Sequence, residues 1–238
     1  MSKVNISLYG NPDPSTISFK NKVICVEGID GSGKSSLIDS IRSRIEERDK
    51  ISVFVVRQPG TGTVGEITRN LIKDPDLNLD PDVKVYLLAA ARRDLMLQLL
   101  RYRESNPDSF IIFDRHVDST WVYQGAEGAD EDLIESLDAA YQWSYASTEV
   151  GPFDNLIPDL LIYLDVEVGV ARSRLFKGRS KPDTYDQKGP DFFKKCKDRY
   201  NILISDYRTI DPDQAVVVVN ANKSEDEVFN YVKPYLGL

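Results

Sequence analysis

The sequence predicts an α/β fold in which helices cover both faces of a five-stranded parallel sheet. Short runs of β-branched and aromatic residues near turn residues are typical of buried strands. Between these runs, apolar residues recur at three- and four-residue spacing, which is typical of helices. This alternation of strand and helix favours a parallel sheet. The predicted strands span residues 22–26, 51–56, 110–113, 159–164 and 215–219. The helical repeats are Leu37/Ile38/Ile41/Ile45, Val64/Ile67/Leu71, Leu87/Ala91/Leu95/Leu99 and Leu133/Ile134/Leu137.

The chain of 238 residues suits one domain of this class, because a single core can grow to about 250 residues before it splits. We assign residues 22–238 to that domain, and hydrophobic residues, at 41% of the chain, suffice for its core. Residues 1–21 contain the segment Asn11-Pro12-Asp13-Pro14 and precede the first strand, so we expect a loosely packed N-terminal extension.

Charge and cysteine content exclude several classes of function. Lys and Arg number 30 against 38 Asp and Glu, a net charge of −8, whereas binding of duplex nucleic acid requires a basic face. Two cysteines, Cys25 and Cys196, are too few for a disulfide framework and indicate a reducing compartment such as the cytoplasm. No stretch approaches the roughly 20 apolar residues of a membrane span.

The clearest motif follows the first predicted strand and precedes the first predicted helix. Residues 28–35 read Gly-Ile-Asp-Gly-Ser-Gly-Lys-Ser, which is the G-x-x-x-x-G-K-S phosphate-binding loop in its required context. Glycines let several backbone N–H groups converge on one anion, and the helix adds its positive N-terminus. Lys34 is expected to reach the β- and γ-phosphates, and the Ser35 hydroxyl to bind Mg²⁺. The predicted ATP-binding residues here are Gly28, Gly31, Ser32, Gly33, Lys34, Ser35 and Ser36.

Three kinds of protein use such a loop. A GTPase reads guanine with Asn-Lys-x-Asp, and Asn222-Lys223-Ser224-Glu225 differs from that pattern in its last residue. Ser224 and Glu227 have the spacing of a capping box, so we interpret this segment as the start of the last helix. An ATP-driven motor or regulatory ATPase is the second possibility. A small-molecule kinase is the third, and it requires a second anion site and a lid that excludes water.

A candidate second anion site lies at the end of the third predicted strand. Residues 110–115 read Phe-Ile-Ile-Phe-Asp-Arg, and parallel α/β folds bind ligands beyond the carboxyl ends of their strands. Asp114 is a candidate metal ligand, directly or through water. Arg115 can grip an acceptor phosphate with two hydrogen bonds. An Asp-Arg pair in this place is also common as a simple ion pair.

The segments around these motifs, taken together, resemble the thymidylate kinase family of P-loop nucleoside-monophosphate kinases. Residues 114–125 read Asp-Arg-His-Val-Asp-Ser-Thr-Trp-Val-Tyr-Gln-Gly and resemble the family's acceptor motif. Residues 57–61, Arg-Gln-Pro-Gly-Thr, resemble its Arg-Glu-Pro-Gly loop, and residues 87–92, Leu-Leu-Ala-Ala-Ala-Arg, its base-binding helix. The resemblance implies Mg²⁺-dependent transfer of a phosphoryl group from ATP to dTMP, giving ADP and dTDP.

The resemblance also implies a role for individual residues. Asp30 would lie near the 3′-hydroxyl of the acceptor sugar, while Arg57 and Arg115 would hold its phosphate. Arg92, helped by Thr120, would hydrogen-bond thymine. Tyr123 would lie under the deoxyribose, where a 2′-hydroxyl would collide with it. The predicted substrate-binding residues are Asp30, Arg57, Leu88, Arg92, Arg115, Ser119, Thr120, Tyr123 and Gln124.

A basic segment is the candidate lid. Residues 172–182 hold five cations in an otherwise acidic chain, and mobile cations can close on the charge of a phosphoryl group in transfer. We place the lid at about residues 172–190. Arg172 is expected to stack on adenine, and Arg174, Lys177 and Arg179 are alternatives for the transfer role. The predicted catalytic residues are Lys34, Asp30, Arg115, Arg174 and Arg179.

Some positions depart from the family pattern. Leu88 stands where the family usually has a Phe that stacks on thymine, and Gln58 replaces a Glu. Residues 183–186, Asp-Thr-Tyr-Asp, replace Asp-Arg-x-Glu. The alternative acceptor is therefore another deoxynucleotide, including one with a modified pyrimidine. The resemblance further implies a homodimer, and the apolar helix at 82–101 offers a surface for it.

Overall fold

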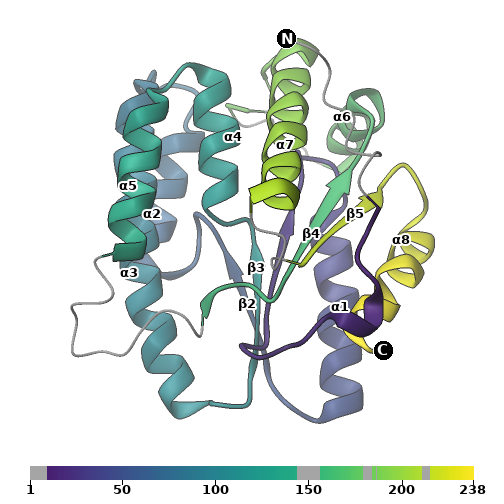
Figure 1. Cartoon of the computed structure of the whole chain (residues 1–238). Helices are drawn as coiled ribbons and strands as arrows, with labels where there is room; N and C mark the ends of the chain where they lie inside the picture. The colour runs from purple at the N-terminus through teal and green to yellow at the C-terminus, as the bar shows by residue number, and fades with distance from the viewer. Residues whose placement is uncertain (1–9, 144–155, 179–183, 186, 211–214) are drawn as a thin grey trace.

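An all-parallel, five-stranded sheet in the order β2-β3-β1-β4-β5 forms the centre of the molecule (Figure 1). The computed structural model describes residues 10–143, 156–178, 184–185, 187–210 and 215–238. Each strand matches a predicted run to within two residues, and β1 and β3 are buried along their whole length. The strands are β1 (Val23–Glu27), β2 (Val53–Arg57), β3 (Phe110–Asp114), β4 (Leu160–Asp165) and β5 (Ala215–Asn220).

Helices flank the sheet, with α2, α3 and α5 grouped on one side of the view and α1 and α8 on the other (Figure 1). Their spacing of apolar residues explains the packing, since Leu37, Ile38, Ile41 and Ile45 on α1 are all buried. The helices are α1 (Lys34–Asp49), α2 (Gly62–Lys73), α3 (Pro81–Ser105), α4 (Val117–Glu127), α5 (Glu131–Trp143), α6 (Val168–Gly178), α7 (Pro190–Ile210) and α8 (Glu225–Val232), with short 3₁₀ turns η2 (Pro14–Thr16) and η4 (Lys233–Leu236).

The apolar repeat predicted for α2 faces solvent in part. Val64 and Ile67 are 38% and 56% exposed, and Val83 and Tyr86 of the neighbouring α3 are exposed as well. The residues of α2 that are buried are Gly65, Thr68 and Ile72. Helical spacing therefore identified the helix correctly but not the face that packs on the domain.

The expectation of a loosely packed N-terminal extension was wrong for residues 10–21. The Asn11 side chain accepts a hydrogen bond from Val218 N (2.8 Å) and donates one to Val218 O (2.9 Å), so its amide pairs with the free edge of β5. Phe19 packs edge-to-face on Phe110, and Asp159 accepts from the backbone of Asn21. A side-chain amide has the same donor and acceptor pair as a peptide group, which lets it cover an edge strand.

The last helix begins as its sequence predicted. Ser224 Oγ accepts from Glu227 N, while the Glu227 carboxylate accepts from Ser224 N, and these bonds complete a capping box. Asn222-Lys223-Ser224-Glu225 is thus a helix start.

In the described part of the chain, no helix has the length and hydrophobicity needed to cross a membrane.

Candidate active site

The carboxyl ends of three adjacent strands meet at one place above the sheet. In the parallel register Arg57 of β2 pairs with Asp114 of β3, and Val26 of β1 pairs with the same Asp114. The phosphate-binding loop leaves β1 directly beyond this point, and Arg115 leaves β3. Strand order therefore gathers residues that lie far apart in the sequence, as a topological switch point requires.

The phosphate-binding loop has the backbone conformation that its glycines allow. Gly33 caps α1 with φ 97°, and Gly31 has φ 82°. A Cβ atom on Gly31 would lie 2.2 Å from Ala171 O, so the close packing of α6 on the loop also requires glycine. The loop thus presents its N–H groups and the start of α1 to the cavity above it.

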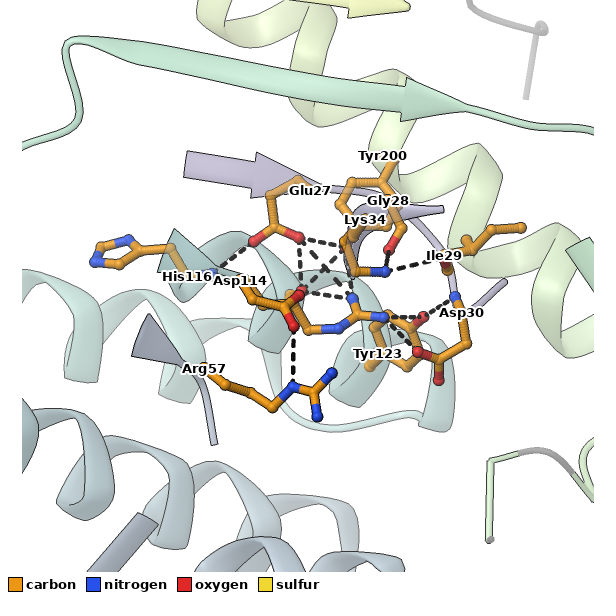
Figure 2. A network of polar contacts seen from close by, with 12 residues as sticks. Glu27, Gly28, Ile29, Asp30, Lys34, Arg57, Asp114, His116, Tyr123 and Tyr200 are labelled. Atoms are coloured by element: carbon orange, nitrogen blue, oxygen red, sulfur yellow. Dashed lines mark hydrogen bonds and ion pairs between the residues drawn. The ribbon is translucent and has the colours of Figure 1, made fainter. Parts of the chain in front are cut away.

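Lys34 folds back over this loop (Figure 2). Its Nζ donates to Gly28 O (2.9 Å) and Ile29 O (3.1 Å), and the side chain is buried. Burial, with the nearby charge of Arg115, lowers the pKa of Lys34 to about 8. The ammonium group is therefore charged at neutral pH and held among carbonyl oxygens that a phosphate can replace.

Arg115 is the centre of a polar network. Its Nη2 lies 2.6 Å from Asp30 Oδ1 and its Nη1 donates to Ser119 Oγ at 2.9 Å, while the guanidinium lies 4.8 Å from the centre of the Tyr123 ring. The residue has φ 75°, a conformation that side chains other than glycine rarely adopt. Burial would raise the pKa of Asp30, but the charges of Arg115 and Lys34 outweigh it and hold that pKa below its ordinary value.

Glu27, which the sequence analysis did not select, organises this network from below. It is 1% exposed and accepts hydrogen bonds from His116 N, Ser119 Oγ and Tyr200 Oη, each at 2.7 Å. Its carboxylate lies 4.0 Å from Arg115 Nη1. Glu27 therefore fixes the groups around Arg115. Its place directly before Gly28 at a strand end was the only available signal.

Asp114 has one oxygen occupied and one available. Its Oδ2 accepts from Arg57 Nε at 2.9 Å, whereas the buried Oδ1 has no hydrogen-bond partner among the described residues. Ser35 lies on the same cavity. A buried carboxylate oxygen and a hydroxyl group fit the hard-oxygen donor set that Mg²⁺ prefers.

The opposite end of the site contains Arg92, buried on α3. Its Nη2 donates to Thr120 Oγ1 (2.6 Å) and its Nε to Gln58 Oε1 (3.2 Å). Leu88 lies one turn before it and is 8% exposed. Tyr123 Oη accepts from Asp30 N at 2.9 Å and so connects this end to the phosphate-binding loop.

One cavity of about 690 Å³ joins these groups. Gly28 and Ser32 do not line it, although Gly28 O accepts from Lys34. The predicted site residues that do line it are Asp30, Gly31, Gly33, Lys34, Ser35, Ser36, Arg57, Leu88, Arg92, Asp114, Arg115, Ser119, Thr120, Tyr123, Gln124 and Arg174.

The first part of the predicted lid is helical. Arg172, Arg174 and Lys177 lie on α6, and Arg179 lies outside the described residues. Arg174 donates to Ala221 O (2.8 Å) and Lys223 O (3.1 Å) beyond β5, and Arg172 lies over the exposed Phe176 ring. Arg174 lines the cavity, whereas the two other described cations, Arg172 and Lys177, are not among its lining residues.

Three further lining residues had no motif to reveal them. Arg69 and Lys73 come from α2, and burial beside Arg57 lowers the pKa of Arg69. Tyr185, from the segment that departs from the family pattern, accepts a hydrogen bond from Gln124 Nε2 at 2.8 Å. His116 also lines the cavity, and burial, with the charge of Arg92, lowers its pKa to about 3. His116 is therefore neutral at physiological pH.

Known proteins of one family are similar to this chain over most of its length. The thymidylate kinase family model matches residues 26–232. This chain belongs to the thymidylate kinase family. It is 32% identical over 215 residues to the thymidylate kinase of Legionella pneumophila (strain Paris), covering 89% of this chain and 92% of that protein. It is 32% identical to the thymidylate kinase of Latilactobacillus sakei (strain 23K), covering 83% and 90%, and 29% identical to that of Chlorobaculum tepidum, covering 87% and 92%.

The match to the thymidylate kinase family begins inside β1 and includes the strands and helices that carry the site. The N-terminal extension precedes it. Gln58 and Leu88, two of the positions at which the sequence departs from the family pattern, line the cavity of this family member, as does Tyr185 from the segment at 183–186.

Proposed function

We propose that this chain transfers the γ-phosphoryl group of ATP to dTMP and releases ADP and dTDP. The observation that carries this proposal is the single cavity described above. It has a phosphate-binding loop at one end, Arg92 at the other, and Arg57 and Arg115 between them. A phosphoryl donor and an acceptor can therefore meet in one cavity, and transfer without hydrolysis then requires that this cavity close over them.

ATP is the donor, and its phosphates lie on the loop. The N–H groups of residues 31–36 and the start of α1 bind phosphate oxygens, and Lys34 leaves its two carbonyl partners for the β- and γ-phosphates. Mg²⁺ would be held by Ser35 and by Asp114 Oδ1, directly or through water, and would neutralise charge on the transferred group.

The acceptor phosphate lies between Arg57 and Arg115. Arg115 is held by Ser119, Tyr200 and Asp30, so its guanidinium is oriented before the substrate arrives. A phosphate on Arg115 releases Asp30, whose carboxylate is then available to the 3′-hydroxyl of the sugar. Preorganised cations of this kind stabilise the charge of the transition state.

The base packs with one face on Leu88. Arg92 and Thr120 contact its edge, and Gln124 completes the pocket. Tyr123 packs beneath the sugar, and its hydroxyl is fixed by Asp30 N. A ribose 2′-hydroxyl would collide with this ring, so we expect the site to select deoxyribose.

Closure over ATP involves the basic residues of α6 and the segment after it. Arg174 lines the cavity near the loop beyond β5, and Arg172 presents a planar group on which adenine can stack. Arg174 and Arg179 are the candidates that bind the transferred phosphoryl group.

A homodimer forms through α2 and α3. Val64, Ile67, Val83 and Tyr86 are exposed on these two neighbouring helices, and apolar residues of this kind gather at subunit interfaces.

A panel of monophosphates with ATP and Mg²⁺, scored for diphosphate formation, tests the proposal. We expect dTMP to be a good acceptor and UMP to be rejected. Phosphorylation of another deoxynucleotide but not of dTMP would favour the alternative acceptor. ATP turnover that no monophosphate stimulates would favour a regulatory ATPase and contradict the proposal.

A further inference from the structure

Gln58 lines the base end of the cavity and has a buried hydrogen-bond donor without a partner among the described residues. The side chain lines the cavity and is 6% exposed. Its Oε1 accepts from Arg92 Nε at 3.2 Å. Because arginine can only donate, this bond fixes which end of the amide faces Arg92, and Nε2 points elsewhere. No acceptor among the residues that the structure describes lies within hydrogen-bond reach of Nε2. A buried donor of this kind is stabilised by an acceptor that arrives with the ligand.

The chemistry of a pyrimidine limits what that acceptor is. The edge of thymine beside Arg92 offers the N3–H donor, the O4 acceptor and the C5 methyl group, which neither donates nor accepts. Gln58 Nε2 and Arg92 are both donors, so neither can pair with N3–H. We assign O4 to Arg92. The methyl group of dTMP offers Gln58 Nε2 no acceptor, whereas an oxygen on the C5 substituent supplies one.

Two residues, Gln58 and Leu88, distinguish the base end of the cavity from the usual family pattern. A glutamate, which the family usually has at position 58, can only accept, and it satisfies Arg92 without adding a donor. Leu88 stands where the family usually has a phenylalanine, so the face of the base packs on an alkyl side chain and not on an aromatic ring. Without that ring stack, the base is held less firmly. Both changes alter the base end of the cavity and leave the phosphate-binding residues as they are.

We propose that Gln58 is a specificity-determining residue, and that the enzyme accepts deoxyuridylates with an oxygen-bearing C5 substituent, such as 5-hydroxymethyl or 5-formyl, about as well as dTMP. This inference rests on the proposed function, because it assumes that a pyrimidine monophosphate occupies the acceptor site. Nε2 donates to the substituent oxygen while Oε1 keeps its bond to Arg92.

The test compares kcat/KM for dTMP, 5-formyl-dUMP and 5-hydroxymethyl-dUMP in the wild type and in Gln58→Glu. This variant keeps an oxygen for Arg92 and replaces the donor with an acceptor. A formyl oxygen can only accept, whereas a hydroxymethyl group can also donate to a carboxylate. The matched control is Gln98→Glu, the same chemical change at an exposed position of α3 that does not line the cavity.

We expect the wild type to use both oxygenated substrates within about threefold of dTMP. In Gln58→Glu the ratio of 5-formyl-dUMP to dTMP should fall by about tenfold or more, while the ratio for 5-hydroxymethyl-dUMP stays within about threefold. Gln98→Glu should change neither ratio. If Gln58 acted only by supporting Arg92, its substitution would lower kcat/KM for all three substrates by the same factor.

A wild type that uses both oxygenated substrates more than about tenfold less well than dTMP would overturn the inference, even if Gln58→Glu folds poorly. Equal losses for all substrates in Gln58→Glu would overturn it too. Either result leaves dTMP phosphorylation intact and concerns the base pocket alone. Failure of the wild type to phosphorylate dTMP or any related deoxyuridylate would instead contradict the proposed function.

Discussion

Replacement of Asp118 by Asn should stabilise the protein at neutral and alkaline pH but not in acid. Asp118 lies on α4, is 5% exposed, and accepts a hydrogen bond from Tyr207 Oη of α7 at 2.7 Å. Burial, with the nearby carboxylate of Glu27, raises the pKa of Asp118 from 3.8 to about 7. Asp138 adds to this effect, and Arg92 opposes it.

The direction of the pH dependence follows from proton binding. Between pH 4 and 7 the folded protein keeps a proton on Asp118 that the unfolded chain has released, so the free energy of unfolding falls as the pH rises. A difference of about three pKa units, at about 1.4 kcal/mol each, amounts to roughly 4 kcal/mol lost by pH 7. Above that pH both states are ionised, and the loss stays constant.

Asn at this position stays neutral at every pH and keeps an oxygen for Tyr207. Asp118→Asn should therefore match the wild type near pH 4 and exceed it at pH 8 by about 2–4 kcal/mol, or a rise in Tm of roughly 5–10 °C. Thermal unfolding at pH 4.5, 6 and 8 measures the gap. Asp39→Asn, at an exposed position of α1, is the matched control and should show no such trend. Equal Tm values for Asp118→Asn and the wild type at pH 8 would refute the reasoning. A difference in Tm that is the same at all three pH values would refute it as well.

Three further predictions concern the site and the subunit surface. Arg115→Ala removes the cation proposed for the acceptor phosphate, so transition-state binding of dTMP should weaken by about 2–5 kcal/mol and kcat/KM should fall roughly 30- to 5,000-fold. ATP affinity by calorimetry should change little, and equal losses for both ligands would count against this role. Because the pKa of Lys34 is about 8, ATP affinity should fall as the pH rises through 8. Lys34→Ala should fold normally and bind ATP weakly at every pH, without that trend. Ile67→Glu should convert a homodimer into a monomer in light scattering, and a wild-type monomer at micromolar concentration would rule out the dimer.

The chemistry that depends on local sequence was predictable. The phosphate-binding loop needs its glycines, Lys34 and Ser35 in consecutive order between a strand and a helix, so one segment of sequence identified it. The five strands were predictable for a similar reason, since buried parallel strands are short, continuous apolar runs. Ser224 and Glu227 identified the start of the last helix through their spacing alone.

Features that depend on contacts across the fold were not predictable. Glu27 orients Arg115 through Ser119 and Tyr200, which join only once α4 and α7 pack together. Arg69 reaches the cavity because α2 lies beside it, and no motif marks that position. Asn11 covers the edge of β5 from 207 residues away. Burial of Leu88, and exposure of Ile67, likewise depend on how α2 and α3 are oriented rather than on helical spacing.

Transfer of label from γ-phosphate-labelled ATP to dTMP tests the central claim most directly. The wild-type protein, incubated with labelled ATP, Mg²⁺ and dTMP, should place the label in dTDP, with little release as free phosphate. Omission of dTMP should suppress the turnover of ATP, because the cavity brings donor and acceptor together rather than admitting water. Label that appears as free phosphate at the same rate with and without dTMP, and never in dTDP, would contradict the account.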